Sequence, residues 1–396
     1  MSAQEQGHRP YLSRLRAILI TVLFLVIVIG IALVSRFESS SVSQTTQTSE
    51  TAVAFTASNP IILNGRANVT YPASYGLLAN YSLGLINKDR TANGLSILRL
   101  SNVGSAQQHA DSEMYFGYFG HWDTQGYKPY MRYTLLGGSG AVSENVALNA
   151  CQDSTHTFIE RCTIETIENA INASEWEMMN NDTICCDNGH RLDILDSFHN
   201  RVAIGIAWNS TSSNVYFVED FENSYFVTST FSYASSVVTI ETSQSMPLYF
   251  NPNKCVFAVY YEPLPKPLRV GFNMTHAELR PDCLSNGATS CSGDSTCGMV
   301  KEAMETKPCE YWGGYDAGQL VGFVFAPCPS GYYCEDVTMG GVRAFYADRL
   351  QSSGKQLLGS ISLAEPITTY GKGVYTLYLY DSLDNNWLTL SIFVNP

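Results

Sequence analysis

Hydrophobic and polar positions divide the chain into an uninterrupted apolar run, a polar stretch, a region of helical spacing and a region of alternation typical of strands. Apolar side chains three to five residues apart predict helices over 75–90, 105–119 and 164–178. The β-branched and aromatic segments 202–208 and 215–221 predict an antiparallel hairpin. Residues 61–226 are therefore expected to form an α+β domain with α/β/α layers.

Residues 227–396 show no convincing helical spacing and many short runs rich in β-branched and aromatic residues. Strands are predicted at 237–242, 255–261, 320–326, 342–347, 357–363, 373–380 and 387–394. Turn signals separate these runs, so the second domain is expected to be all-β and sandwich-like.

The apolar run near the N-terminus predicts a transmembrane signal-anchor helix at 17–35. Residues 17–34 carry no charge, and at about 1.5 Å per residue they span roughly 27 Å of bilayer. Three arginines precede the run, so residues 1–16 are expected to be cytoplasmic and the bulk of the chain extracellular. The alternative is a cleaved signal peptide, but the run is long and Ala32-Leu33-Val34 is a poor cleavage site.

Residues 36–60 predict a flexible stalk because segment 39–51 holds nine Ser or Thr among thirteen residues. The whole chain has a formal charge of −13, and only 15% of its residues are charged. Without residues 1–36, which hold four Arg and one Glu, 19 basic and 35 acidic residues remain, a net of −16. This charge excludes a nucleic-acid partner, since it repels phosphate backbones.

Cysteines and glycosylation sequons share one side of the predicted span. All 11 Cys lie between Cys151 and Cys334, which predicts disulfides in an oxidising exterior. The Cys-rich loop 283–309 has no C-x-x-C pair, so a disulfide-stapled loop is favoured over a zinc ribbon. An odd cysteine count leaves at least one thiol free or intermolecular. Six sequons follow the span, at Asn68, Asn80, Asn172, Asn181, Asn209 and Asn273.

Four polar residues of the first domain are candidate site residues because each is predicted at a helix or turn boundary. They are His121, Glu144, Glu177 and His190. Two imidazoles and one or two carboxylates can bind zinc or another divalent metal, or run acid/base chemistry on a bound water. Their spacing contains no helical i, i+4 pair, so the alternative is that each is a surface or capping group.

The order of motifs along 65–225 resembles the CAP superfamily, in particular its microbial branch of SCP domains. The motifs are INKDR (86–90), AQQHADSEM (106–114), FGHWDTQG, SENVA (143–147), NGHRLDIL (188–195), VAIGIAW and YFVEDF. The resemblance implies an α/β/α sandwich with a cleft of two His and two Glu that holds zinc in some members. His121, Glu144 and His190 fall on motif positions, whereas Glu177 is displaced from the motif and Glu175 is its alternative.

The remaining candidates are expected to have supporting roles. His109 is predicted to be a packed core residue, and His156, His199 and His276 to face solvent. Asp123 and Arg132 are predicted to orient the His121 loop by hydrogen bonds. Nearby aromatic residues are expected to cover the sheet or line the cleft, namely Trp122, Tyr127, Tyr130 and Tyr133.

Three functions fit these features. The first is a membrane-anchored extracellular module that binds a ligand, surface protein or metal through its His/Glu cleft. The second is an extracellular metal-assisted hydrolase or peptidase, although no G-x-S-x-G or H-E-x-x-H motif occurs. The third is a surface structural or adhesion protein that acts through its β-domain. The first is favoured, so a conventional enzyme is not expected.

Overall fold

The computed structural model describes residues 73–123, 125–182, 188–208, 213–250, 255–265, 318–327, 337–339 and 342–395. The predicted tail, membrane span, stalk and Cys-rich loop lie outside these ranges, as does His276. Among the described residues, no helix is both long and apolar enough to cross a membrane. All of them belong to one compact unit, Ala52–Pro396.

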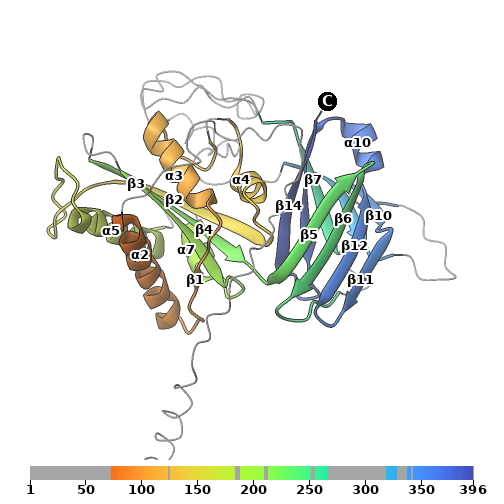
Figure 1. The fold of residues 1–396 in the computed structure, drawn as a ribbon, viewed down its shortest axis with the longest axis horizontal. Helices are drawn as coiled ribbons and strands as arrows, with labels where there is room; N and C mark the ends of the chain where they lie inside the picture. The colour runs from red at the N-terminus through yellow and green to blue at the C-terminus, as the bar shows by residue number, and fades with distance from the viewer. Residues whose placement is uncertain are drawn as a thin grey trace, which may run out of the picture. The chain divides into compact units, whose positions relative to one another are not determined.

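The first sheet has four strands in the order β1-β3-β4-β2 (Figure 1). The strands are β1 (Arg99–Leu100), β2 (Ala141–Ala150), β3 (Arg201–Trp208) and β4 (Asn214–Asn223). β3 and β4 form the predicted hairpin, β2 pairs antiparallel with β4, and β1 adds a parallel edge to β3. Almost every side chain of β3 and β4 is buried, which shows that both faces of the sheet are covered.

Helices pack on both faces of this sheet (Figure 1). They are α2 (Ala73–Ala92), α3 (Ser105–Phe116), α4 (Pro129–Leu135), α5 (Ile164–Asn180) and α7 (Gly189–Leu195). On one face Ile86 of α2, Ile171 of α5 and Ile194 of α7 share a core with the sheet. On the other, α3 lies so close to β3 that a Cβ on Gly205 would be 2.1 Å from the Ala106 carbonyl oxygen. The α/β/α layering and the three predicted helices are thus present.

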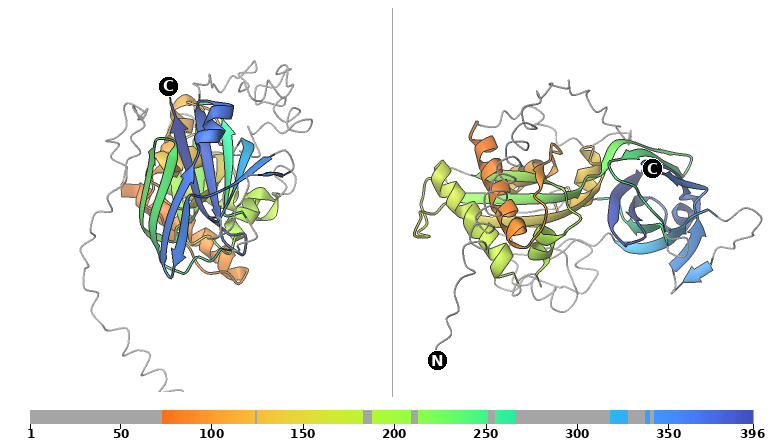
Figure 2. Two further views of the ribbon diagram at one scale, coloured as in Figure 1. Left: turned by 90° about the vertical axis from the view of Figure 1, so that its right-hand side faces the viewer. Right: turned by 90° about the horizontal axis from the view of Figure 1, so that it is seen from below.

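The second part of the chain forms two sheets that face each other (Figure 2). Their strand orders are β14-β13-β7-β8-β10-β9 and β11-β12-β6-β5. The strands are β5 (Phe226–Ala234), β6 (Val237–Gln244), β7 (Phe257–Glu262), β8 (Gln319–Phe325), β9 (Val337–Met339), β10 (Val342–Tyr346), β11 (Arg349–Ser353), β12 (Gln356–Ser362), β13 (Gly373–Tyr380) and β14 (Asn386–Val394). Ile240 and Leu357 of one sheet share a core with Val259, Leu377 and Leu390 of the other.

The two parts meet where α4 and the end of β4 contact β13 and β14. Tyr130 and Met131 of α4 pack against Val374. Asn223 Nδ2 donates to the carbonyl oxygen of Asn386 at 2.7 Å. The predicted domain boundary at 226/227 falls just after the two-residue connection between β4 and β5.

Several elements differ from the sequence-based expectation. Residues 227–396 were expected to lack helices, yet α10 (Ala364–Tyr370) is helical. Its Pro366 lies in the first turn, where a missing N–H costs no intrahelical hydrogen bond. β2 and α4 were not predicted; in β2, three Ala, two Asn and one Glu among ten residues give a low strand propensity. Pairing with β4 along its full length overrides that propensity.

Candidate functional site

Glu144 lies within β2, an edge strand of the sheet, and not at a helix or turn boundary as predicted. In the register with β4, Glu144 lies opposite Asp220, and Asn145 lies opposite Glu219. Successive residues of a strand point to opposite faces. Glu144 and Asp220 therefore face α3 and α4, whereas Asn145 and Glu219 face α5 and α7. Acidic groups are buried on both faces of the same strand pair.

On the α3 face, Arg132 of α4 ties Glu144 to the loop that carries His121. Arg132 Nη2 donates to Glu144 Oε2, and Nη1 donates to the carbonyl oxygens of His121 and Tyr127, each at 2.8 Å. His121 Nδ1 lies 3.0 Å from Glu144 Oε1. Asp123 Oδ1 accepts from the backbone N–H of Tyr127 at 2.8 Å. Asp123 and Arg132 therefore order the His121 loop, as the sequence predicts.

Burial sets the charges of this network. Burial alone would lower the pKa of Arg132, but Glu144 and Asp123 raise it above its ordinary value, so the guanidinium stays charged. Burial also raises the pKa of Glu144. The pKa of Asp220 lies well above its usual range, first through burial and then through repulsion by Glu144. The raised pKa favours the protonated form of Asp220, and an interaction with Asp220 lowers the pKa of Glu144.

His109 is fully buried on α3, as predicted for a core histidine. Its Nε2 lies 2.7 Å from the carbonyl oxygen of Gly120, which accepts, so Nε2 carries the proton. Glu113 Oε1 accepts from the Gly120 N–H at 3.1 Å. Burial lowers the pKa of His109 and raises that of Glu113, which favours the neutral form of both groups. The two side chains thus hydrogen-bond both the carbonyl oxygen and the N–H of Gly120, the residue before His121.

On the opposite face, the buried acid of α5 is Glu175, whereas Glu177 is exposed to solvent. The Glu175 carboxyl interacts with Glu219 of β4, and Asn145 Nδ2 donates to Glu219 Oε2 at 3.4 Å. Burial raises the pKa of Glu219 to about 8 and that of Glu175 well above its usual value. Within the described residues, no lysine or arginine pairs with either acid. Protons therefore neutralise this pair.

His190 lies in the first turn of α7 and is held by an acid that was not predicted. Its Nδ1 lies 2.6 Å from Asp182 Oδ1, and Asp182 Oδ2 accepts from the backbone N–H of Arg191 at 3.1 Å. Of the four predicted site residues, only His121 and Glu144 contact each other in the structure.

The arrangement does not fit a tetrahedral metal site built from the four predicted residues. Both oxygens of Glu144 are engaged, one by the Arg132 guanidinium, whose fixed positive charge opposes a cation. In the part of the chain that the structure describes, no group of three or more His, Cys, Asp or Glu side chains is placed to hold a metal ion. The binding of zinc or another divalent metal remains a prediction from the sequence.

The INKDR motif has a structural use. Asn87 pairs with the backbone of Leu98, donating through Nδ2 at 3.1 Å and accepting through Oδ1 at 2.7 Å. Arg90 is fully buried and donates to the carbonyl oxygens of Ile194 and Asp196 at 2.6 and 2.9 Å. This arginine therefore fixes the turn between α7 and β3.

That turn carries His199, which the sequence wrongly places in solvent; its exposed fraction is 6%. His199 Nε2 lies 3.1 Å from Ser143 Oγ, and its Nδ1 lies 2.7 Å from Asn223 Oδ1. Sequence reasoning misses this contact because 56 positions separate Ser143 from His199, and the pairing of β4 with both β2 and β3 brings them together.

The second part of the chain also reaches α4. Glu262 of β7 forms a buried ion pair with Lys128 at 2.8 Å and accepts a hydrogen bond from the Tyr130 hydroxyl. The Lys128 ammonium also lies 4.8 Å from the ring centroid of Trp122. Because α4 carries Arg132, Glu262 helps to position the network around Glu144.

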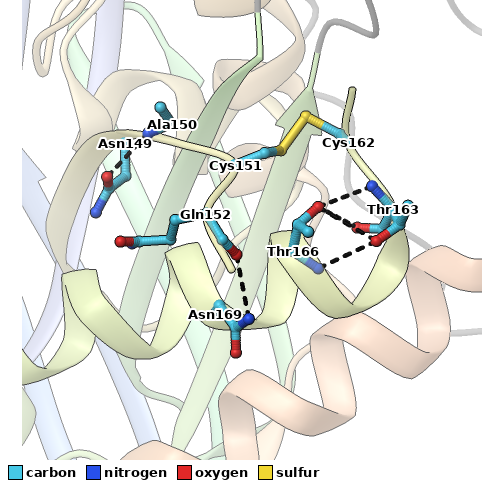
Figure 3. The surroundings of a disulfide bond; sticks show 8 residues. All are labelled: Asn149, Ala150, Cys151, Gln152, Cys162, Thr163, Thr166 and Asn169. Carbon is cyan, nitrogen blue, oxygen red and sulfur yellow. Dashed lines mark hydrogen bonds between the residues drawn. A yellow bond between two sulfur atoms is a disulfide. The ribbon is translucent and has the colours of Figure 1, made fainter. Parts of the chain in front are cut away.

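A disulfide between Cys151 and Cys162 closes the loop that follows β2 (Figure 3). Thr163 and Thr166 form a capping box at the start of α5, directly after Cys162. Asn169 of α5 donates to the carbonyl oxygen of Gln152 at 3.1 Å. The loop is therefore anchored at both ends, and the prediction of disulfides is confirmed for this pair.

Comparisons with known proteins give weak likenesses. No family model matches the sequence, and no curated protein matches it. Among solved structures, the chain is similar to the CAP domain of enterococcal PrgA, at 15% identity and a TM-score of 0.27, over 37% of this chain and 61% of that one. It is also similar to an outer surface protein from Borrelia burgdorferi, at 14% identity and a TM-score of 0.26, over 38% of this chain and 91% of that one. At these scores the likenesses establish neither family nor function.

Proposed function

We propose that this chain is a membrane-anchored extracellular binding module of CAP type, in which the His/Glu residues stabilise the fold and an exposed loop contacts a surface protein or glycan. The order of the CAP-like motifs and the helix, sheet, helix layers support the CAP assignment. The uncharged segment 17–35 supports the anchor. The sequon residues Asn80, Asn172 and Asn181 are exposed, which suits an extracellular location.

The observation that carries the proposal is the disulfide loop 151–162. Phe158 is 71% exposed at this loop, although its backbone forms a β-bridge with Gln152. The Asp153 carboxylate accepts from the backbone N–H groups of Thr155 and Thr157 at 2.8 and 3.0 Å, which stiffens the turn. A rigid, exposed aromatic ring binds a partner with little loss of side-chain entropy. The disulfide itself suits an oxidising exterior.

Substitution of Phe158 tests this proposal. Cells that display the full chain are perfused over layers of extracellular-matrix glycoprotein, and their retention is measured. Phe158→Ser should reduce retention about tenfold, as expected when an anchoring aromatic worth ~1.4 kcal/mol or more is removed. The matched control is Leu383→Ser, which changes a residue 78% exposed on the β13–β14 loop and should retain wild-type adhesion. Equal retention of wild type and Phe158→Ser would contradict the proposal.

One observation favours the alternative of adhesion through the β-domain. The outward face of sheet β11-β12-β6-β5 carries rows of hydroxyls, such as Thr228 opposite Ser243 and Ser232 opposite Thr239. A hydroxyl-rich face suits hydrogen bonding to glycans. If Phe158→Ser adheres normally and Thr230→Lys on this face does not, the β-domain is the adhesive part.

A further inference from the structure

Ser143, His199 and Asn223 form a continuous hydrogen-bonded chain on the α5 and α7 face of the first sheet. Ser143 lies on β2 opposite Phe221 of β4, and Asn223 is two residues further along β4, so both side chains point to the same face. The His199 imidazole bridges them, with 3.1 Å from Nε2 to Ser143 Oγ and 2.7 Å from Nδ1 to Asn223 Oδ1.

The direction of these hydrogen bonds follows from Asn223. Its Nδ2 donates to the carbonyl oxygen of Asn386, which has no proton to give, so Oδ1 faces the imidazole and accepts from Nδ1–H. In a neutral imidazole the proton on Nδ1 leaves a lone pair on Nε2. Nε2 is therefore the acceptor for the Ser143 hydroxyl. Burial lowers the pKa of His199, which keeps the ring neutral at pH 7.

The imidazole is held rigidly. The Phe221 ring stacks on it with centroids 5.6 Å apart and an interplanar angle of 21°. Arg90 donates to the His199 carbonyl oxygen at 3.3 Å. His199 is thus buried and fixed, while Ser143 is only half-buried.

Two acids lie near this chain. Asp196 Oδ2 is 3.9 Å from His199 Nε2 and is half-exposed. The Asp193 carboxyl hydrogen-bonds with Ser143, and burial raises its pKa to about 7. The hydrogen bond from Ser143 lowers the Asp193 pKa, so the ionised carboxylate accepts from Ser143, and protonation of Asp193 frees the serine proton for His199.

We propose that Ser143 is a nucleophile, His199 its general base and Asn223 the positioning residue of an acyl-transfer site for carboxylic esters. The arrangement meets the geometric requirement for an activated serine, namely a base within hydrogen-bond reach that a third group orients. The site is separate from the Arg132 network, which lies on the opposite face of the sheet, and it goes beyond the proposed binding function. Because Asn386 orients Asn223, both parts of the chain build the site.

The reaction balances without a metal or cofactor. Ser143 Oγ bonds to the ester carbonyl carbon while its proton moves to His199 Nε2. The bond from that carbon to the alcohol oxygen breaks, and Nε2 returns the proton to the leaving alcohol. Water then attacks the acyl-serine with His199 again as base, which releases the carboxylic acid and restores the serine.

A small fluorophosphonate probe tests the proposal on the full chain in detergent micelles. Attack by Ser143 Oγ forms an O–P bond and releases fluoride, and mass spectrometry locates the labelled residue. Wild type should be labelled at Ser143 at least 100-fold faster than Ser143→Ala or His199→Gln. Ser229→Ala, a half-buried serine of β5, is the matched control and should react like wild type.

Two further variants separate positioning from general damage. Asn223→Ala should slow labelling about tenfold, and Asn223→Asp, which keeps an oxygen facing Nδ1, should restore it. Ser143→Cys should be alkylated by iodoacetamide faster than Ser143→Cys combined with His199→Gln, provided that both retain the native near-UV circular dichroism. Labelling of native wild type at the Ser143→Ala rate, or equal alkylation of the two cysteine variants, would overturn the proposal.

Discussion

The two faces of the β2–β4 pair bury acids at adjacent positions but neutralise them differently. On the α3 face, Glu144 lies opposite Asp220, and the charged Arg132 compensates Glu144. On the α5 face, Glu175 and Glu219 share protons, since no described lysine or arginine pairs with them. The α3 face thus combines an ion pair with acids of raised pKa, whereas the α5 face holds its acid pair by protons alone.

This difference follows from which helix covers each face. α4 places Arg132 over Glu144, and Glu262 of the second part holds α4 through Lys128. α5 instead places Glu175 against Glu219. A buried carboxylate without a cation is costly, so it takes up a proton instead. The α3 face is therefore expected to fail on loss of charge, and the α5 face on a rise in pH.

Removal of the cation should have the largest effect. Arg132→Met leaves the buried Glu144 carboxylate without its guanidinium and removes the hydrogen bonds to the His121 loop, at a cost of about 3–5 kcal/mol. Urea unfolding followed by tryptophan fluorescence measures the change. Arg343→Met is the matched control, because Arg343 pairs with Glu365 in solvent and such pairs contribute less than ~1 kcal/mol. Similar losses in the two variants would show that the α3 face does not depend on its ion pair.

The pH dependence should come next in size and arise on the α5 face. Between an unfolded pKa near 4.5 and the folded pKa of about 8, the unfolded chain loses the Glu219 proton while the folded chain keeps it, so stability falls as pH rises. Glu219→Gln removes this titration. The free energy of unfolding of the variant minus that of wild type should therefore increase by ~2 kcal/mol between pH 6.5 and pH 8.5.

The pH 6.5 reference limits interference from histidines. Burial lowers the pKa values of His109 and His199, so their protonation in the unfolded chain reduces stability mainly below about pH 6.5. Glu241→Gln on the exposed face of β6 is the control and should leave the slope of stability against pH unchanged. If Glu219→Gln also leaves that slope unchanged, the acids of the α5 face are not neutralised by protons.

The helix and sheet layers of the first domain can be predicted from the sequence, because the spacing of apolar residues reflects which side chains are buried. The apolar spacing of 75–90 and 164–178 locates α2 and α5, and β-branched runs locate the β3–β4 hairpin. It also identifies Asp123 and Arg132 as supports of the His121 loop.

The partners across the sheet are less predictable. Glu144 pairs with Asp220 through strand register, and no local pattern reveals β2. Glu175 and Glu177 differ by two positions on a helix, so one faces the sheet and the other faces solvent. His199 has polar neighbours in the sequence, which predict exposure. The residue is nevertheless buried, because Arg90, more than 100 positions earlier, donates a hydrogen bond to the His199 carbonyl oxygen. Such contacts depend on tertiary structure alone.

The smallest effect should come from a neutral hydrogen bond at the edge of the α3 face. The Tyr133 hydroxyl donates to Glu222 Oε2 at 3.1 Å and accepts from the Gly140 N–H at 3.3 Å. Tyr133→Phe removes both bonds but no charge, so it should cost about 1–2 kcal/mol, less than Arg132→Met. Burial already raises the pKa of Glu222 to about 7, so loss of the hydroxyl donor should raise it further and make the cost larger at pH 8.5 than at pH 6. A cost that does not change with pH would mean that Glu222 takes no part in the proton balance of the α3 face.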